Sequence, residues 1–341
     1  MAQGRIDRRR GAANAAMLAA LLEVLALAPA TAGAVPAAPV PASHVPASPV
    51  RPSHAPASRV PTSRVPTSRV ETELRFNLDE AQFARENLAL LGKGYRLADL
   101  SVFAAGSQLV VAGIWERHAG DPPALPARVA QLALLQHLRL TPSALDALGE
   151  QQFAQHSVPE IIEGYHLGGA LYFAAVFSPP DGPVMGRASP GMLRPDLGQA
   201  QKDARSAGLE LARVDAYVNK GQVWFSPVFV PGPTVKRQSS FGLDAVAFGE
   251  KADALRLEHA RPLSISAYDD GAGAPILLYA GVFDPPGSPA RVLVLDQVPA
   301  QFQLELVRQR KAGRRIIDID GGATSPGDIR YSAVFEAVSG D

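Results

Sequence analysis

Residues 109–115 of the sequence read LVVAGIW, and this short apolar stretch decides the fold because its pattern recurs. Four further copies are LYFAAVF at 171–177, VWFSPVF at 223–229, LLYAGVF at 277–283 and IRYSAVF at 329–335. Each copy holds a pair of residues without bulk and ends on an aromatic residue, namely Trp115, Phe177, Phe229, Phe283 and Phe335. Spacings of 52 to 62 residues indicate a tandem-repeat architecture. We predict that these five aromatic residues form the structural core of the repeats.

A second apolar stretch precedes each copy. The five stretches are LADLSVF at 97–103, PEIIEGY at 159–165, LARVDAY at 211–217, PLSISAY at 262–268 and RIIDID at 315–320. Residues typical of turns lie between the paired stretches, including Gly106 and the pairs 168–169, 220–221, 270–271 and 321–322. Two apolar stretches joined by a glycine-containing turn predict a β-hairpin. In the fifth repeat this interpretation assigns Asp318 and Asp320 to turn chemistry.

A helix is predicted before each hairpin. In the first repeat Asn77 is a candidate N-cap with Glu80 at the capping-box position, and apolar residues recur at helical spacing as far as Leu91. The later helices are predicted to begin at Thr141-Pro142, at Pro195, near residue 243 and at Pro299. The second repeat is longer, and its extra residues predict an additional helix over 127–138.

The predicted fold class is α+β, with about five tandem αββ repeats, each a helix plus a β-hairpin. A unit of about 52 residues cannot bury its own apolar side, so the repeats are expected to stack in an arc or ring. The predicted repeats are about 74–120, 121–182, 190–232, 239–287 and 291–338, within a domain of residues 74–341.

The first 73 residues have a different character. Four arginines between residues 5 and 10 precede an apolar stretch at 12–30, and AGA at 32–34 is a small-x-small cleavage site. We therefore predict a signal peptide at 1–34. Residues 35–73 are rich in Pro, Ala, Ser and Arg and predict a disordered linker. The protein is expected to be secreted or periplasmic, with no membrane span in the mature chain.

Composition narrows the possible functions. The 33 basic and 33 acidic residues balance overall, but the arginines near the N-terminus leave the repeats mildly acidic, so nucleic-acid binding is not expected. The absence of cysteine excludes disulfides and thiolate chemistry. The seven histidines contain no pair spaced three to five residues apart, so we predict no metal site and no cofactor.

Several of these segments also carry a family resemblance. GYR at 94–96 with AGIWE at 112–116 is the clearest copy, followed by FAAVF at 173–177 and YSAVFE at 331–336. Over residues 74–338 the sequence resembles the tandem-repeat family called bacterial tandem repeat domain 1, whose repeat is similar to the N-terminal domain of fungal polyglycine hydrolases. There the repeats are often attached to a serine-hydrolase domain related to β-lactamases. No Ser-x-x-Lys occurs in this sequence, so the resemblance implies a repeat module and no catalytic residues.

Two functions are consistent with these observations. The first is a secreted, non-catalytic repeat module that binds, or is accessory to, an extracellular or envelope target, either a protein or an envelope polymer. Basic residues clustered at 308–315 form either a solvated helix end or a contact patch for anions. The alternative is an extracellular hydrolase of peptides or glycans that uses carboxylates from different repeats: Glu116, Glu163, Asp215, Asp318 and Glu336. Two carboxyl groups about 5–9.5 Å apart in a cleft would support the alternative.

Overall fold

The computed structural model describes residues 70–180, 186–232, 236–269, 276–325 and 327–338. The predicted signal peptide and the predicted linker as far as residue 69 lie outside the described residues. The first strand begins at Val70, four residues before the predicted start of the repeat domain. Residues 70–73 therefore belong to the folded part of the chain.

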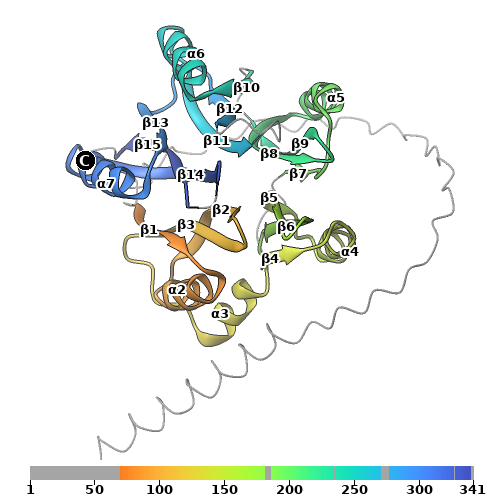
Figure 1. Ribbon diagram of the computed structural model, residues 1–341. Coiled ribbons are helices and arrows are strands. Elements are labelled where there is room, and N and C mark those ends of the chain that lie inside the picture. Colours follow the sequence, from red (N-terminus) through yellow and green to blue (C-terminus); the bar gives the residue numbers. More distant parts are fainter. Residues whose placement is uncertain (1–69, 181–185, 233–235, 270–275, 326, 339–341) are drawn as a thin grey trace, which may run out of the picture. The chain divides into compact units, whose positions relative to one another are not determined.

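The first repeat shows the plan of the unit. It consists of β1 (Val70–Leu78), α2 (Glu80–Gly92), β2 (Arg96–Ala105) and β3 (Gln108–His118). Strand β3 lies between β1 and β2 and is antiparallel to both. The unit is therefore β-α-β-β, whereas the sequence predicted only the helix and the hairpin that follows it (Figure 1).

Four more units repeat this plan. The second contains α3 (Pro126–Ala133), β4 (Gln136–Leu140), α4 (Pro142–Phe153), β5 (Pro159–Leu167) and β6 (Ala170–Phe177). The third contains β7 (Arg187–Ala188), α5 (Arg194–Ser206), β8 (Leu209–Asn219) and β9 (Gln222–Pro231). The fourth contains β10 (Gln238–Asp244), α6 (Ala245–Leu257), β11 (Arg261–Asp269) and β12 (Leu277–Asp284). The fifth contains β13 (Arg291–Gln297), α7 (Pro299–Lys311), β14 (Arg314–Ala323) and β15 (Ile329–Ala337).

Across the described residues the fold is thus a mixed one of six helices and five three-stranded antiparallel sheets. In every sheet the strand before the helix is the outer strand, the last strand is central, and the strand after the helix is the inner strand. The inner strands are β2, β5, β8, β11 and β14. Each inner strand is hydrogen-bonded to its own sheet along one edge only, so the backbone groups of its other edge need partners elsewhere.

Two local predictions need correction. The cap of α2 is Asp79, so the predicted cap at Asn77 is wrong. The Asp79 carboxylate accepts a hydrogen bond from the Gln82 backbone amide, and the Asp79 backbone amide donates one to the Gln82 side chain. Asn77 instead has a φ of 58° at the end of β1, where the register shifts. The predicted helix over 127–138 ends at Ala133, because the residues from Gln136 pair with β6.

The five repeat aromatic residues occupy equivalent places near the end of the central strands, and each is at most 2% exposed. The small residues before them leave room for large neighbours. A Cβ added at Gly113 would lie 2.7 Å from the Trp115 ring, and one at Gly281 would lie 2.5 Å from the Phe248 ring. Close packing of this kind makes protein interiors sensitive to a single added methyl group.

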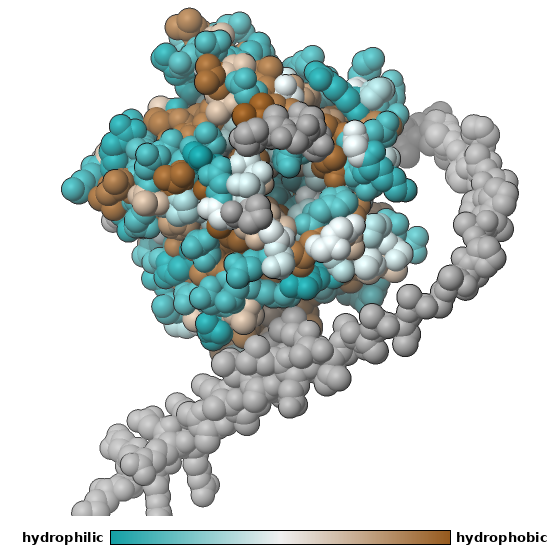
Figure 2. Space-filling model, in the orientation of Figure 1, coloured by the Kyte–Doolittle hydropathy of each residue, from teal (hydrophilic) through white to brown (hydrophobic). Residues whose placement is uncertain are grey.

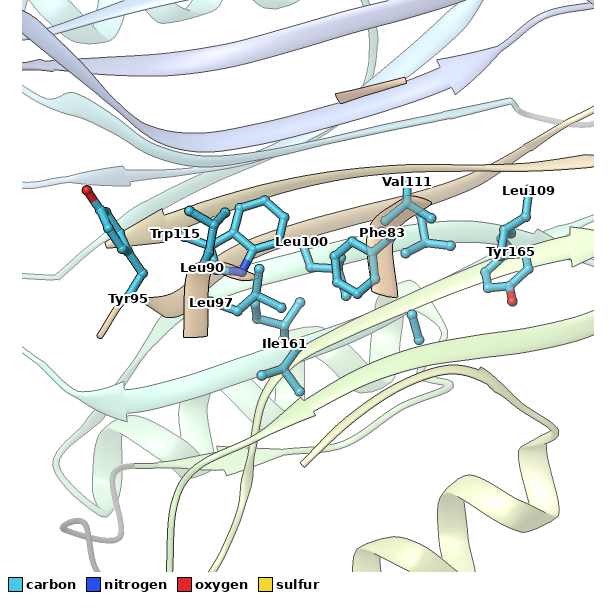
Figure 3. Packing of buried hydrophobic residues seen from close by; sticks show 13 residues of the cluster. Phe83, Leu90, Tyr95, Leu97, Leu100, Leu109, Val111, Trp115, Ile161 and Tyr165 are labelled. Carbon is cyan, nitrogen blue, oxygen red and sulfur yellow. The ribbon is translucent and has the colours of Figure 1, made fainter. Parts of the chain in front are cut away.

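Apolar packing extends from each unit to the next. Figure 3 shows one cluster, in which Phe83 and Trp115 of the first unit pack with Ile161 and Tyr165 of the second. Equivalent clusters join the second unit to the third, the third to the fourth and the fourth to the fifth. The units therefore shield one another from water, as expected for repeats too small to close a core alone.

A further cluster joins the fifth unit to the first. It contains Phe302 and Tyr331 of the fifth unit and Ile114 of the first. The rings of Phe103 and Tyr331 meet edge to face with centroids 5.9 Å apart. The inner strands follow the same sequence of contacts, from β2 through β5, β8 and β11 to β14, and β14 also contacts β2.

Most of the surface seen in Figure 2 is hydrophilic, with brown patches over the end of α6. Exposed apolar side chains of that helix include Val246 and Leu257, which are 72% and 75% exposed. Among the described residues, none of the helices has the length and apolar character needed to cross a membrane.

Candidate functional site

The free edges of the inner strands determine where polar side chains are needed. Backbone N–H groups on the edge of a sheet must find other partners when they are buried. At the junction of the fifth and first units, Asp99 accepts a hydrogen bond from the Ile319 amide at 2.7 Å, and Ser101 Oγ accepts one from the Gly321 amide at 3.0 Å. Side chains of β2 thus cap the free edge of β14.

The same arrangement recurs at three further junctions. Asp318 and Asp320 accept from the Ile265 and Ala267 amides at 2.8 and 2.5 Å, Ser266 from the Ala216 amide at 3.0 Å, and Asp215 from the Gly164 amide at 2.7 Å. In each case an inner strand presents a short polar side chain to the amides of the unit before it. We conclude that these aspartates and serines hold neighbouring units together.

A shared irregularity places the capping residues. Every inner strand has a register shift near its start, after which two positions two residues apart face the same way. The first of these positions forms what we call the first polar layer: Asp99, Ile161, Arg213, Ser264 and Asp318. The second forms the second polar layer: Ser101, Glu163, Asp215, Ser266 and Asp320. The two layers contain five carboxyl groups and one guanidinium.

Arg213 supplies the positive charge of the first polar layer. Its guanidinium forms an ion pair with Asp99, lies 3.5 Å from an Asp318 oxygen, and donates to the Ala98 carbonyl at 3.1 Å. Burial opposes the charged form of Arg213, but the carboxylates of Asp99 and Asp318 raise its pKa above the ordinary value. Arg213 therefore links the third unit to the first and the fifth.

The second polar layer has no such cation, and its acids are correspondingly hard to ionise. Burial, followed by the neighbouring charge of Asp320, raises the pKa of Asp215 to about 8. Burial likewise raises the pKa of Asp320 to about 7. The pKa of Glu163 is raised well above its usual range by burial and by the charges of Asp215 and Asp320. With pKa values of about 8 and about 7, Asp215 and Asp320 retain much of their protons near neutral pH.

A cavity of about 360 Å³ lies over the second polar layer. Its polar lining includes Glu163, Asp215 and Asp320, and all five units contribute residues to its wall. The aromatic part of the wall comes from the position two residues further along four of the inner strands: Phe103, Tyr165, Tyr217 and Tyr268. Strand β14 has Gly322 at this position. A cavity of this size and mixed lining is typical of a site for a small molecule or a protruding chemical group.

Glu163 differs from the other members of its layer. The first-to-second junction lacks the capping pattern because Ile161 holds the place that Asp99 and Asp318 hold in their units. Among the described residues, the Glu163 carboxyl has no hydrogen-bond partner, whereas Asp215 accepts from Gly164 and Ser266. Glu163 is therefore the carboxyl group of the cavity that is available to a ligand.

The structure divides the carboxylates proposed from the sequence into two groups. Glu163, Asp215 and Asp318 lie together in the polar layers. Glu116 and Glu336 instead share Arg315, at 2.5 and 3.0 Å, away from the cavity. The prediction that Asp318 and Asp320 belong to a turn is wrong, since both lie within β14.

Sequence reasoning also missed five polar residues of the layers: Asp99, Ser101, Arg213, Ser264 and Ser266. A signal for them was present in the sequence. The inner strands carry polar residues two apart within apolar surroundings, as in DLS at 99–101, RVD at 213–215, SIS at 264–266 and DID at 318–320. Within the described residues, no group of three or more His, Asp or Glu side chains has the arrangement needed to hold a metal ion.

The five equivalent sheets and the hydrogen bonds between units define the class of this protein. It is a tandem array of β-α-β-β repeats. Comparison with known families specifies it further: the sequence model of the polyglycine hydrolase-like structural repeat matches residues 70–118, 191–231 and 289–338. Three segments of the chain therefore belong to this repeat family, which confirms the resemblance seen in the sequence. The matched segments correspond to the first, third and fifth units. No match was found among curated proteins.

Proposed function

We propose that the protein is a secreted or periplasmic, non-catalytic repeat module that binds a target through the cavity over the second polar layer. The observation that carries this proposal is the lining of the cavity, where five units contribute residues and Glu163 has no partner among the described residues. The other carboxyl groups of the layers are occupied by backbone amides of neighbouring units. Their role is accordingly structural, and Glu163 is the carboxyl group that contacts the target.

The chemistry of the cavity favours a target with a positively charged organic group. Carboxylates form charge-assisted hydrogen bonds with ammonium and guanidinium groups, and aromatic faces attract the same cations. A cation over Glu163 and Asp215 would favour their ionised forms, because an opposite charge lowers the pKa of a buried acid. Binding should therefore release protons and strengthen as the pH rises through the pKa of about 8 that Asp215 has in the unliganded protein.

Calorimetric titration with agmatine, which carries a guanidinium and an ammonium group, tests this proposal. We expect saturable binding, with proton release revealed by different heats in buffers of different ionisation enthalpy. Glu163→Gln should weaken binding by about tenfold or more, since a charge-assisted hydrogen bond contributes roughly 1.5–3 kcal/mol. The matched control Glu150→Gln changes an exposed acid of α4 and should leave binding unaltered. Binding that is insensitive to Glu163→Gln would contradict the proposal.

Export is part of the proposal and has its own test. Expression of the full chain in a Gram-negative host should give a periplasmic or secreted product. Its N-terminal sequence should begin at residue 35, after AGA at 32–34. A product that stays in the cytoplasm with residue 1 intact would contradict this part of the proposal.

We also propose that the five units close into a ring. Support comes from the contact of β14 with β2 and from the cluster that joins Tyr331 to Ile114. The absence of cysteine allows a clean test. A double variant with cysteines in place of Glu116 and Arg315, which form an ion pair between the first and fifth units, should be joined by a short bismaleimide. Cysteines in place of Glu116 and Lys251 should not be joined, and equal yields would contradict closure.

A hydrolase remains the alternative function, and one observation favours it. Glu163 and Asp215 are adjacent members of one layer, and both have raised pKa values, as a general acid requires. Screening the mature protein against peptide and glycan substrates would reveal turnover that Glu163→Gln abolishes. Agmatine binding without turnover would favour the binding module.

A further inference from the structure

A second pocket, of about 440 Å³, lies between the fourth and fifth units. It is formed where the end of α6 and the start of β11 meet the starts of β13 and β14. The described residues that line it are Arg256, Leu257, His259, Arg261, Ala290, Arg291, Val292 and Arg314. None of these lining residues is acidic, so the pocket has a strongly basic wall.

Two of the arginines are neutralised by carboxylates that lie outside the pocket. Arg291 forms ion pairs with Asp284 at 2.7 Å and with Glu336 at 3.0 Å. Arg256 forms an ion pair with Asp253 at 3.2 Å. These two guanidinium groups therefore add little net charge to the wall.

Arg261 and Arg314 are held in a different way. Arg261 Nη1 donates to the Ala260 and Arg256 carbonyls at 2.9 and 3.3 Å, and Arg314 Nη1 donates to Gln309 Oε1 at 2.9 Å. Neutral acceptors fix each guanidinium and leave its charge in place. Among the described residues neither guanidinium has a carboxylate partner, and each has several N–H donors left over.

We propose that this pocket binds the dianionic phosphate of a phosphate monoester. Two uncompensated guanidinium charges match the charge of the dianion, and the planar fork of arginine fits phosphate oxygens in pairs. The pocket extends beyond the space of a phosphate, and Leu257 and Val292 offer an apolar wall to the rest of the molecule. The site is separate from the cavity over the second polar layer and does not depend on the function proposed for that cavity.

Calorimetric titration of the full chain with glycerol 3-phosphate, inorganic phosphate and dimethyl phosphate tests the proposal. We expect glycerol 3-phosphate to bind most tightly and dimethyl phosphate, a monoanion, to bind at least tenfold more weakly. Arg261→Gln and Arg314→Gln should each weaken binding by about tenfold or more, because each removes charge-assisted hydrogen bonds. Arg139→Gln removes the same charge from an exposed ion pair with Glu80 in the first and second units and should change nothing.

Lysine variants make the test independent of folding defects. Arg261→Lys and Arg314→Lys keep the charge and lose the fork, so their affinities should fall between those of the wild type and the glutamine variants. Three outcomes would overturn the proposal: no saturable binding of glycerol 3-phosphate, equal binding of dimethyl phosphate, or an equal loss in Arg139→Gln. Glu163→Gln should leave phosphate binding intact, so failure here is distinguishable from failure of the cavity proposal.

Discussion

The carboxylate of Asp99 accepts a hydrogen bond of 2.7 Å from the backbone amide of Ile319, which lies 220 positions further along the chain. The same carboxylate forms an ion pair with Arg213 of the third unit. One side chain therefore connects the inner strands of the first, third and fifth units. Short-range helices and hairpins build each unit, but contacts of this kind fix the units to one another.

Replacing Asp99 should destabilise the folded repeat domain. Asp99→Ala leaves the buried Ile319 amide without its acceptor and weakens the neutralisation of Arg213, and breaking a buried ion pair typically costs about 3–5 kcal/mol. We expect a loss of this size in the free energy of unfolding measured by chemical denaturation. Asp253→Ala removes a carboxylate from an exposed ion pair and should cost less than about 1 kcal/mol. Equal losses in the two variants would contradict a structural role for Asp99.

Stability should decrease as the pH rises through neutrality. The pKa values of Asp215 and Asp320 in the folded protein are about 8 and about 7, whereas their ordinary value is 3.8. The folded state thus holds protons that the unfolded state has released, and this contribution is present at low pH and is lost as the pH passes these folded-state values. Each group contributes a slope of roughly 1 kcal/mol per pH unit. Denaturation at intervals between about pH 5.5 and pH 8, where ordinary carboxylates are already ionised, measures the slope.

The pH dependence has a matched control. Asp215→Asn should flatten the slope above about pH 6, because the asparagine cannot ionise in its place. Asp146→Asn, at a position on α4 outside the layers, should leave the slope unchanged. A wild-type protein that becomes more stable between neutrality and pH 8 would contradict the charge arrangement described here.

Glu163→Gln should stabilise the protein at alkaline pH. The ionised Glu163 lies near Asp215 and Asp320, and the repulsion from these acids outweighs the attraction of Arg213, so a neutral side chain of the same shape removes a net repulsion. We expect a higher Tm than that of the wild type at alkaline pH and a smaller difference at acidic pH, because the raised pKa of Glu163 favours its neutral form as the pH falls. The exposed Glu150→Gln should show no such pH-dependent difference, and a lower Tm for Glu163→Gln at alkaline pH would indicate a stabilising partner for Glu163.

Gly321→Ala should destabilise the junction of the fifth and first units. A Cβ at this position would lie 2.5 Å from the Phe103 ring and 3.1 Å from the Arg330 carbonyl oxygen. Overpacking of this kind costs about 1–3 kcal/mol. Gly198→Ala lies within α5 with nothing inside 4 Å of the added Cβ and should gain up to about 1 kcal/mol. Thermal melts of the two variants should therefore shift in opposite directions.

The sequence predicts the hairpins and the helices because their signals are local. The aromatic residue and the small pair of each central strand recur at nearly constant spacing, and the helix starts carry proline or a capping residue. The sequence analysis does not predict the outer strands, although β1 alternates apolar and polar residues in VETELRF at 70–76 and β13 is rich in Val and Leu. Two other outer strands carry weak signals. Strand β7 has two residues, and β10 has the sequence QSSFGLD, which shows no regular alternation.

The polar layers could not be predicted with the rules used for single strands. Aspartate is disfavoured in strands, so DID at 318–320 was interpreted as part of a turn. In the structure, Asp318 and Asp320 are stabilised in the strand by another unit, because they accept hydrogen bonds from the amides of Ile265 and Ala267 on β11. Strand propensities consider only neighbouring residues, so they do not detect a hydrogen-bond partner 53 positions away.

The contact between the fifth and first units has a consequence for the order in which the units can be encoded. Since the last unit packs on the first much as each earlier unit packs on its successor, no junction depends on which unit is encoded first. In the closed ring that we propose, a circularly permuted chain that begins with the second unit and finishes with the first retains all five junctions. Loss of an entire unit would bring together two surfaces that have not been matched. A chain with its units in rotated order is therefore expected to fold more readily than a chain with a unit added or removed.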